Sequence, residues 1–203
     1  MAERRGPIAL IAGGGLLLAL SWWAASADGV SRIEEDLFRL FNDWPDWLEK
    51  PVWPVMQLGA IAAVPVVAAV AWVLTKKWRL AAGIAVAALG SWLLAKVVKS
   101  LIERGRPQDL LADINFRPEW EGLGFVSGHA AVVFATAAIL SPYLSQPWKM
   151  VAWGLAVITG VLRMYTAAHL PLDITGGAGL GLAVAGVWQL ATFRPDPALT
   201  GGA

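Results

Sequence analysis

Residues 52–74 read VWPVMQLGAIAAVPVVAAVAWVL, a run of 23 residues without a charged side chain. A helix needs about 20 mostly apolar residues to cross about 30 Å of hydrocarbon, so this run predicts a transmembrane helix. The same criterion, applied outward in both directions along the chain, predicts about six spans. They are Ile8–Ala25, Val52–Leu74, Trp78–Val98, Val126–Leu144, Met150–Tyr165 and Leu172–Phe193.

The composition of the 203 residues also indicates a membrane protein. Hydrophobic residues make up 57% and charged residues 15%, with 12 Trp and no Cys, whereas a soluble domain averages about 25% charged residues. A net charge of +1 provides no basic excess for a nucleic-acid partner. The lack of Cys excludes a disulfide scaffold, a thiolate metal site and a cysteine nucleophile. We therefore expect residues 1–203 to form one all-α integral membrane domain.

Cationic residues near the predicted span ends indicate the topology. By the positive-inside rule, the cytoplasmic ends are those that carry Arg4, Arg5, Lys76, Lys77, Arg79, Lys149 and Arg194. The other nine Lys and Arg fall on the opposite side with 13 of the 15 acids, and we interpret their clustering as part of a site. We expect a multi-pass cell-membrane protein with both termini cytoplasmic and residues 194–203 as a loose tail. A cleaved signal peptide is the alternative for the first segment, although its apolar run is long for one.

Residues 31–50 form a separate element between the first two predicted spans. Ser31 and Glu34 fit a capping box at a helix start. Apolar side chains between Ile33 and Leu48 form a broad face opposite acidic residues, as in helices that lie in a membrane interface. We predict a short interfacial helix in the first extracytoplasmic loop, and both a connector packed on the bundle and a lid over a site stay open.

The polar residues near the membrane gather at the extracytoplasmic ends of the predicted spans. They are Lys99 and Arg106 after the third span, Ser127, Gly128 and His129 at the start of the fourth, Arg163 at the end of the fifth, and His169 and Asp173 around Pro171 before the sixth. Ionisable groups at a membrane boundary are costly and indicate a functional site. Lys96 and Arg104 are expected to extend to the interface as snorkelling side chains. Arg117 and Glu119 are expected in a solvated loop, with a head-group contact as the alternative.

This set of residues suits phosphoryl transfer. Three cations and the N–H groups of a helix that starts at Ser127 can hold phosphate oxygens. Pro171 suits the first position of a helix, which would place His169 just outside that helix and Asp173 in its first turn. The carboxylate could then orient one imidazole for attack while the other histidine protonates the leaving group. A His–His–Asp metal site is disfavoured because the three cations would repel a divalent ion.

The spacing Lys99-x6-Arg106-Pro107, Ser127-Gly128-His129 and Arg163-x5-His169-x3-Asp173 resembles the three-part motif of the type 2 phosphatidic acid phosphatase superfamily. Its membrane branch contains lipid phosphate phosphatases. The resemblance implies a six-span bundle that hydrolyses a lipid phosphate or diphosphate through a phosphohistidine, without a metal or cofactor. It implies His169 as nucleophile, Asp173 as its orienting partner and His129 as general acid. The phosphate would be held by Lys99, Arg106, Ser127, Gly128 and Arg163.

Two positions depart from the family pattern, and several alternatives stay open. Val126 stands where a Pro is common, and Leu162 stands where a Ser is common; the second change removes a hydroxyl near the phosphate. Polyprenyl diphosphate, phosphatidylglycerol phosphate and phosphatidic acid all fit as substrates, and the oligomeric state is open. The competing function is a transporter or binding protein for anionic lipid head groups.

Overall fold

The computed structural model describes residues 4–117 and 121–192, and within these ranges every regular element is a helix. The helices are α1 (Arg5–Ala25), α2 (Arg32–Asn42), α3 (Glu49–Met56), α4 (Val64–Thr75), α5 (Trp78–Ile102), α6 (Pro107–Leu110), α7 (Gly128–Leu140), α8 (Gln146–Tyr165) and α9 (Pro171–Ala191). Short 3-10 turns lie at Asp46–Leu48, Gln57–Gly59, Ile61–Ala63 and Ser141–Tyr143. Glu119 and the expected tail, residues 194–203, lie outside the described residues.

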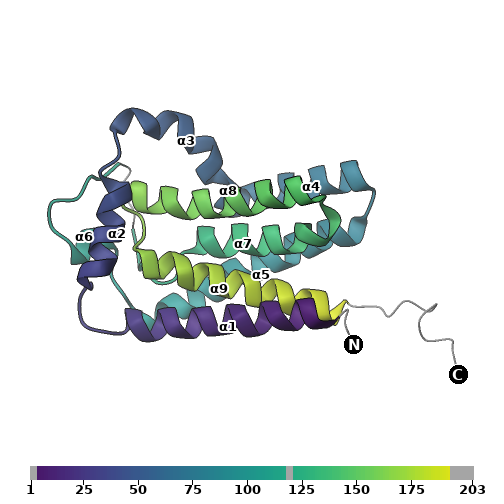
Figure 1. Ribbon diagram of the computed structural model, residues 1–203, viewed down its shortest axis with the longest axis horizontal. Coiled ribbons are helices and arrows are strands. Elements are labelled where there is room, and N and C mark those ends of the chain that lie inside the picture. Colours follow the sequence, from purple (N-terminus) through teal and green to yellow (C-terminus); the bar gives the residue numbers. More distant parts are fainter. Residues whose placement is uncertain (1–3, 118–120, 193–203) are drawn as a thin grey trace, which may run out of the picture.

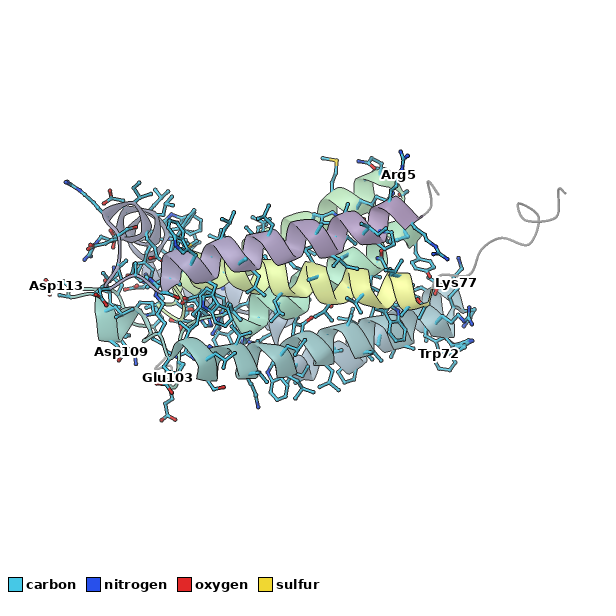
Figure 2. All side chains as sticks on the ribbon, turned by 90° about the horizontal axis from the view of Figure 1, so that it is seen from below. Arg5, Trp72, Lys77, Glu103, Asp109 and Asp113 are labelled. Carbon is cyan, nitrogen blue, oxygen red and sulfur yellow. The ribbon has the colours of Figure 1, made fainter. Side chains whose placement is uncertain are left out.

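The long helices run side by side along one axis, and α2 crosses one end of the bundle (Figure 1). The start of α1 and the end of α9 lie at the opposite end (Figure 1). Figure 2 shows Arg5 and Lys77 at that opposite end, whereas Glu103, Asp109 and Asp113 lie at the end that α2 crosses. The end away from α2 thus carries cationic side chains, whereas the α2 end carries acids together with cations such as Arg39 of α2 itself.

The prediction of an all-α membrane protein agrees with these helices. Among the described residues, Arg5–Ala25, Trp78–Leu110 and Pro171–Ala191 are long and apolar enough to cross a membrane. A fourth span is added if the bent pair Asp46–Gly59 and Ile61–Thr75 is taken together. The expectation of six spans stays a prediction.

The prediction of one continuous helix over residues 52–74 was wrong. The segment is broken between α3 and α4, and the parts before and after the break are bent relative to each other by 72°. Ala60 has extended backbone at the break (ψ 138°), so the helical hydrogen bonds cannot continue through it. Pro65 lies in the first turn of α4 and Pro54 lies inside α3. The break brings Gly59 against His129, because a Cβ on Gly59 would lie 2.8 Å from that of His129.

Helix α2 is shorter than the predicted 31–50 segment and ends at Asn42. Ser31 is its N-cap, as expected, and accepts a hydrogen bond from the Glu34 N–H at 3.2 Å. The Glu34 carboxylate does not complete a capping box, because it bonds Arg104 instead. Phe38 is fully buried, whereas Ile33 and Leu40 are 75% and 60% exposed. The helix thus packs on the bundle through one face and leaves an apolar stripe uncovered.

Helix α9 approaches α7 closely at two glycines. A Cβ on Gly177 would collide with the Ser127 carbonyl, and one on Gly181 would collide with the Ala131 carbonyl. Only a residue without a side chain allows this approach of the two backbones. The contact brings the start of α9, with Asp173, beside the start of α7.

Candidate active site

The three sequence motifs meet at the end of the bundle that α2 crosses. Lys99 lies in the last turn of α5, and Arg106 is the N-cap of α6. Ser127 is the N-cap of α7 and Gly128 its first residue, followed by His129. Arg163 lies in the last turn of α8, His169 in the connection to α9, and Asp173 in the first turn of α9. These placements agree with the helix positions predicted for Ser127, Gly128, His129, Arg163, His169 and Asp173. Lys99 lies on a helix longer than expected, and Arg106 precedes a short helix that was not predicted.

One hydrogen bond joins the start of α7 to the start of α9, and a second caps α7 itself. The Ser127 hydroxyl accepts from the Ala130 N–H at 3.4 Å, as an N-cap does. The Ser127 N–H donates to the Asp173 carbonyl at 2.8 Å. Ser127 is fully buried, so the second motif is fixed directly against the third.

The Asp173 carboxylate binds the chain that leads into its own helix. Its Oδ2 accepts from the Leu170 N–H at 2.9 Å and lies 3.4 Å from Nδ1 of His169. Pro171 occupies the first helical position, as predicted, where its missing N–H would have no partner in any residue type. The contact of Asp173 with Nδ1 leaves Nε2 on the other edge of the ring for a reacting group.

His169 is almost completely buried among cationic residues. Burial lowers the pKa of its imidazole well below the usual range, and electrostatic interactions with Lys99, Arg163, Arg106 and His129 lower that pKa further. The ring is therefore neutral at pH 7, the state in which a histidine nitrogen can act as a nucleophile.

The Lys99 ammonium is held by the loop that leads to α7. It donates to the Leu123 carbonyl and, at 2.8 Å, to the Gly124 carbonyl. Gly124 is itself confined, since a Cβ there would lie 2.5 Å from the Gly105 carbonyl and 3.1 Å from Asp173 Oδ2. The loop thus connects the first motif to the second and third.

The Arg106 guanidinium is also held by carbonyl groups. Its Nε donates to the carbonyls of Glu121 and Gly122 at 3.0 and 2.9 Å, and Nη1 donates to the Ala168 carbonyl at 2.6 Å. Ala168 directly precedes His169, so Arg106 lies next to the nucleophile expected from the sequence. Arg163 approaches from α8 and is 2% exposed.

Sequence reasoning missed two charged residues beside the site. Arg104 was expected to snorkel toward the interface, but its side chain is 5% exposed and bonds both Glu34 and Asp173. Glu34 was assigned to the polar face of an interfacial helix, but it is 4% exposed. Arg104 stands two positions before Arg106 in the first motif, which is the one sequence signal that could have linked it to the site.

The Arg117 side chain is buried against other parts of the chain, with 3% of it exposed. Its guanidinium carbon lies 3.7 Å from the centroid of the Tyr165 ring. The same side chain donates to the carbonyls of Asn42, Trp44 and Tyr165. It ties the loop after α6 to α2 and α8, so the prediction of a solvated loop is wrong at Arg117.

Comparisons with known proteins agree with this architecture. Residues 76–195 match the PAP2 superfamily. Phosphatidylglycerophosphatase B of Bacillus subtilis (strain 168) is 38% identical over 102 residues, which cover 44% of this chain and 47% of that protein. The chain thus spans about half the length of this curated relative in the match.

Two solved structures share the fold. The crystal structure of Aquifex aeolicus LpxE has a TM-score of 0.72 and 25% identity, covering 79% of this chain and 96% of that one. The crystal structure of a transmembrane PAP2 type phosphatidylglycerolphosphate phosphatase from Bacillus subtilis has a TM-score of 0.71 and 24% identity, covering 90% and 94%. Both similarities extend well beyond the motifs.

Proposed function

This chain belongs to the PAP2 superfamily, and on that premise we propose that it is an integral membrane phosphatase that hydrolyses a lipid phosphate or diphosphate. The observation that carries the proposal is the position of His169. Its ring is buried, contacts Asp173 through Nδ1 and is surrounded by Lys99, Arg106 and Arg163. A neutral imidazole among three cations is suited to attack an anionic phosphorus centre.

The reaction would proceed in two balanced steps. Nε2 of His169 attacks phosphorus, the bond to the leaving oxygen breaks, and His129 gives that oxygen a proton. The product is a phosphohistidine, with Asp173 supporting the positive ring through Nδ1–H. Water then gives a proton to His129 and attacks phosphorus, which releases inorganic phosphate and restores His169.

The remaining residues of the site would bind the phosphate oxygens. Arg106 and Arg163 offer planar N–H forks, and Lys99 offers an ammonium group. The N–H groups at the start of α7, beginning with Gly128 after the Ser127 cap, add dipoles of the sign that a phosphate requires. These groups stabilise the negative charge that is redistributed in the transition state.

A groove beside α7 supports a substrate with an apolar tail. Val133, Ala137 and Leu140 follow His129 at intervals of four, eight and eleven residues, so they share its face of the helix. They line an apolar groove of about 160 Å³ together with side chains of α4 and α8 and with Leu58. Polyprenyl diphosphate, phosphatidylglycerol phosphate and phosphatidic acid each combine such a tail with a phosphate. The names of the Bacillus subtilis relatives favour phosphatidylglycerol phosphate.

We propose six spans, and the distribution of charge supports cytoplasmic termini and an extracytoplasmic site. Arg5 and Lys77 lie at the end away from the site (Figure 2), where the positive-inside rule predicts the cytoplasm. We propose that α2 lies in the opposite interface. Ile33, Leu37 and Leu40 are exposed on one side of α2, and they would enter the head-group region of the lipid.

The test is phosphate release by the purified protein in detergent. Each of the three candidate lipids is supplied with the protein and with the His169→Ala variant, and inorganic phosphate is measured. We expect release from at least one lipid, a loss of at least about 10⁴-fold in the variant and a radiolabelled phosphohistidine in the parent protein alone. Full activity in the variant would contradict the proposal. Lipid movement across vesicles without phosphate release would instead favour the transporter.

A further inference from the structure

Three buried charged side chains from separate elements form a continuous chain of hydrogen bonds that ends at His169. Glu34 comes from α2, Arg104 from the connection between α5 and α6, and Asp173 from α9. The side chains of all three are at most 5% exposed. Burying a charge is costly unless it is paired, so these three groups depend on one another.

Arg104 uses both arms of its guanidinium on Glu34. Nη1 lies 3.0 Å from Oε1, and Nη2 lies 2.7 Å from Oε2. Such a two-bond contact fixes the plane of the guanidinium as well as its position. Nη1 then also donates to Oδ1 of Asp173 at 3.1 Å.

The two oxygens of Asp173 consequently have separate tasks. Oδ1 is held by Arg104, whereas Oδ2 accepts from the Leu170 N–H and contacts Nδ1 of His169. A carboxylate held at Oδ1 cannot rotate without breaking the bond to Arg104. The orientation of Oδ2 toward the imidazole therefore depends on a guanidinium that Glu34 has fixed.

We infer that Glu34 and Arg104 are positioning residues that orient Asp173 toward His169 and thereby set the turnover rate. The inference rests on the proposed function, because both residues act through the Asp173–His169 pair. It also gives α2 a role beyond those of connector or lid, since α2 supplies one end of the chain that supports the nucleophile. Glu34 lies outside residues 76–195, the part of the chain that matches the superfamily.

A purely structural role is the competing explanation. Oε1 of Glu34 also accepts from the Leu172 N–H at 3.2 Å, so the residue fastens α2 to the start of α9. Loss of such a clamp would reduce the fraction of correctly folded protein. Loss of positioning would reduce turnover in every correctly folded molecule. Turnover expressed per active site therefore distinguishes the two explanations, because it falls only if positioning is lost.

The experiment compares Glu34→Gln, Arg104→Gln and Arg104→Lys with the matched control Glu35→Gln. Glu35 is the next residue on α2 and forms an ion pair with Arg39 on the surface. For each variant, the stoichiometry of bound vanadate, a phosphate analogue whose binding needs no turnover, counts the active sites, and steady-state phosphate release gives kcat and KM on the preferred lipid. Detergent-purified full-length protein is used throughout.

We expect kcat per active site to fall about 10-fold in Glu34→Gln and about 100-fold in Arg104→Gln, the range found when supporting groups are removed. KM should stay within about twofold, because neither side chain belongs to the phosphate-binding set. Arg104→Lys, which keeps the charge, should retain more activity than Arg104→Gln. A double variant that combines Glu34→Gln with Arg104→Gln should be no slower than Arg104→Gln alone, because Glu34 acts through Arg104.

Normal turnover per active site in Glu34→Gln would overturn the inference, even if fewer sites were counted. So would a loss in Glu35→Gln equal to that in Glu34→Gln. If Arg104→Gln does not fold, the conservative Glu34→Gln variant decides. An inactive parent protein would remove the proposed function and this inference together, whereas an active parent with unaffected variants would remove only the inference.

Discussion

The two sides of the site hold their charged groups in different ways. On the phosphate-binding side, Lys99 and Arg106 donate to backbone carbonyls. On the nucleophile side, Asp173 is bonded by Arg104, and Arg104 is bonded in turn by Glu34. The cations on the phosphate-binding side therefore have neutral backbone partners, whereas Asp173 on the nucleophile side has a charged partner.

This difference matches the two tasks that we propose. A carbonyl dipole fixes a cation without cancelling its charge, so the phosphate-binding side keeps a positive potential for an incoming anion. Asp173 must instead remain charged while fully buried, and a cation beside it reduces the cost of that burial. The phosphate-binding side therefore attracts the negative charge of the substrate, and the nucleophile side stabilises the negative charge of Asp173.

The largest expected effect in this comparison follows Asp173→Asn. The amide keeps the size of the side chain but cannot support a positive imidazole, so kcat should fall about 10³- to 10⁴-fold. KM should change little, because the phosphate-binding side is intact. The measurement is phosphate release from the preferred lipid at saturating concentration.

The natural control for this variant is Asp109→Asn. Asp109 bonds the Arg106 N–H through Oδ2 at 2.8 Å, and its carboxylate has no bond to His169. A loss below about 10-fold in Asp173→Asn would mean that the carboxylate does not support the nucleophile. A loss of kcat in Asp109→Asn as large as in Asp173→Asn would mean that the effect of Asp173→Asn is not specific to the contact with His169.

Arg106→Gln, on the phosphate-binding side, should have a smaller effect on kcat than Asp173→Asn and should also change KM. Removing one charged donor from a preorganised anion site reduces kcat about 10²- to 10³-fold, and the lost attraction should also raise KM. The measurement is the dependence of rate on lipid concentration. An effect on kcat alone would contradict the division between the two sides.

Arg39→Gln provides the matched control. Arg39 also donates to two loop carbonyls, those of Ala112 and Asp113, but it lies on the exposed side of α2. We expect both kinetic constants to stay near the parent values.

Much of both sides could be predicted where local rules govern the placement of a residue. Ser127 at a helix start and Pro171 at a first helical position follow from backbone chemistry within a few residues. Those two positions fix where His129, His169 and Asp173 lie along the chain. That these helices come together was predicted from the order of the three motifs along the chain. The sequence did not show that Gly177 and Gly181 allow the close approach of α9 to α7.

The support of Asp173 by Arg104 and Glu34 could not be predicted, because it depends on partners about 70 residues apart. Nothing local distinguishes Glu34 from Glu35, yet one carboxylate is buried on Arg104 and the other pairs with Arg39 on the surface. The break after Gly59 was missed for a related reason. Hydropathy measures composition, and a segment without charges gives the same value whether its helix is continuous or broken.

The smallest effect should come from a region that neither side of the site includes. Ala152 lines the apolar groove beside α7, and a phenyl ring there would occupy space that we assign to the lipid tail. Ala152→Phe should raise KM for a long-chain substrate about 10-fold, since filling a fitted apolar site costs about 1–3 kcal/mol. Hydrolysis of a short-chain analogue should be unchanged, because its phosphate meets intact groups on both sides. Val151→Phe is the matched control, as Val151 is exposed on α8 outside the groove, and equal effects of the two variants would remove the groove as the tail site.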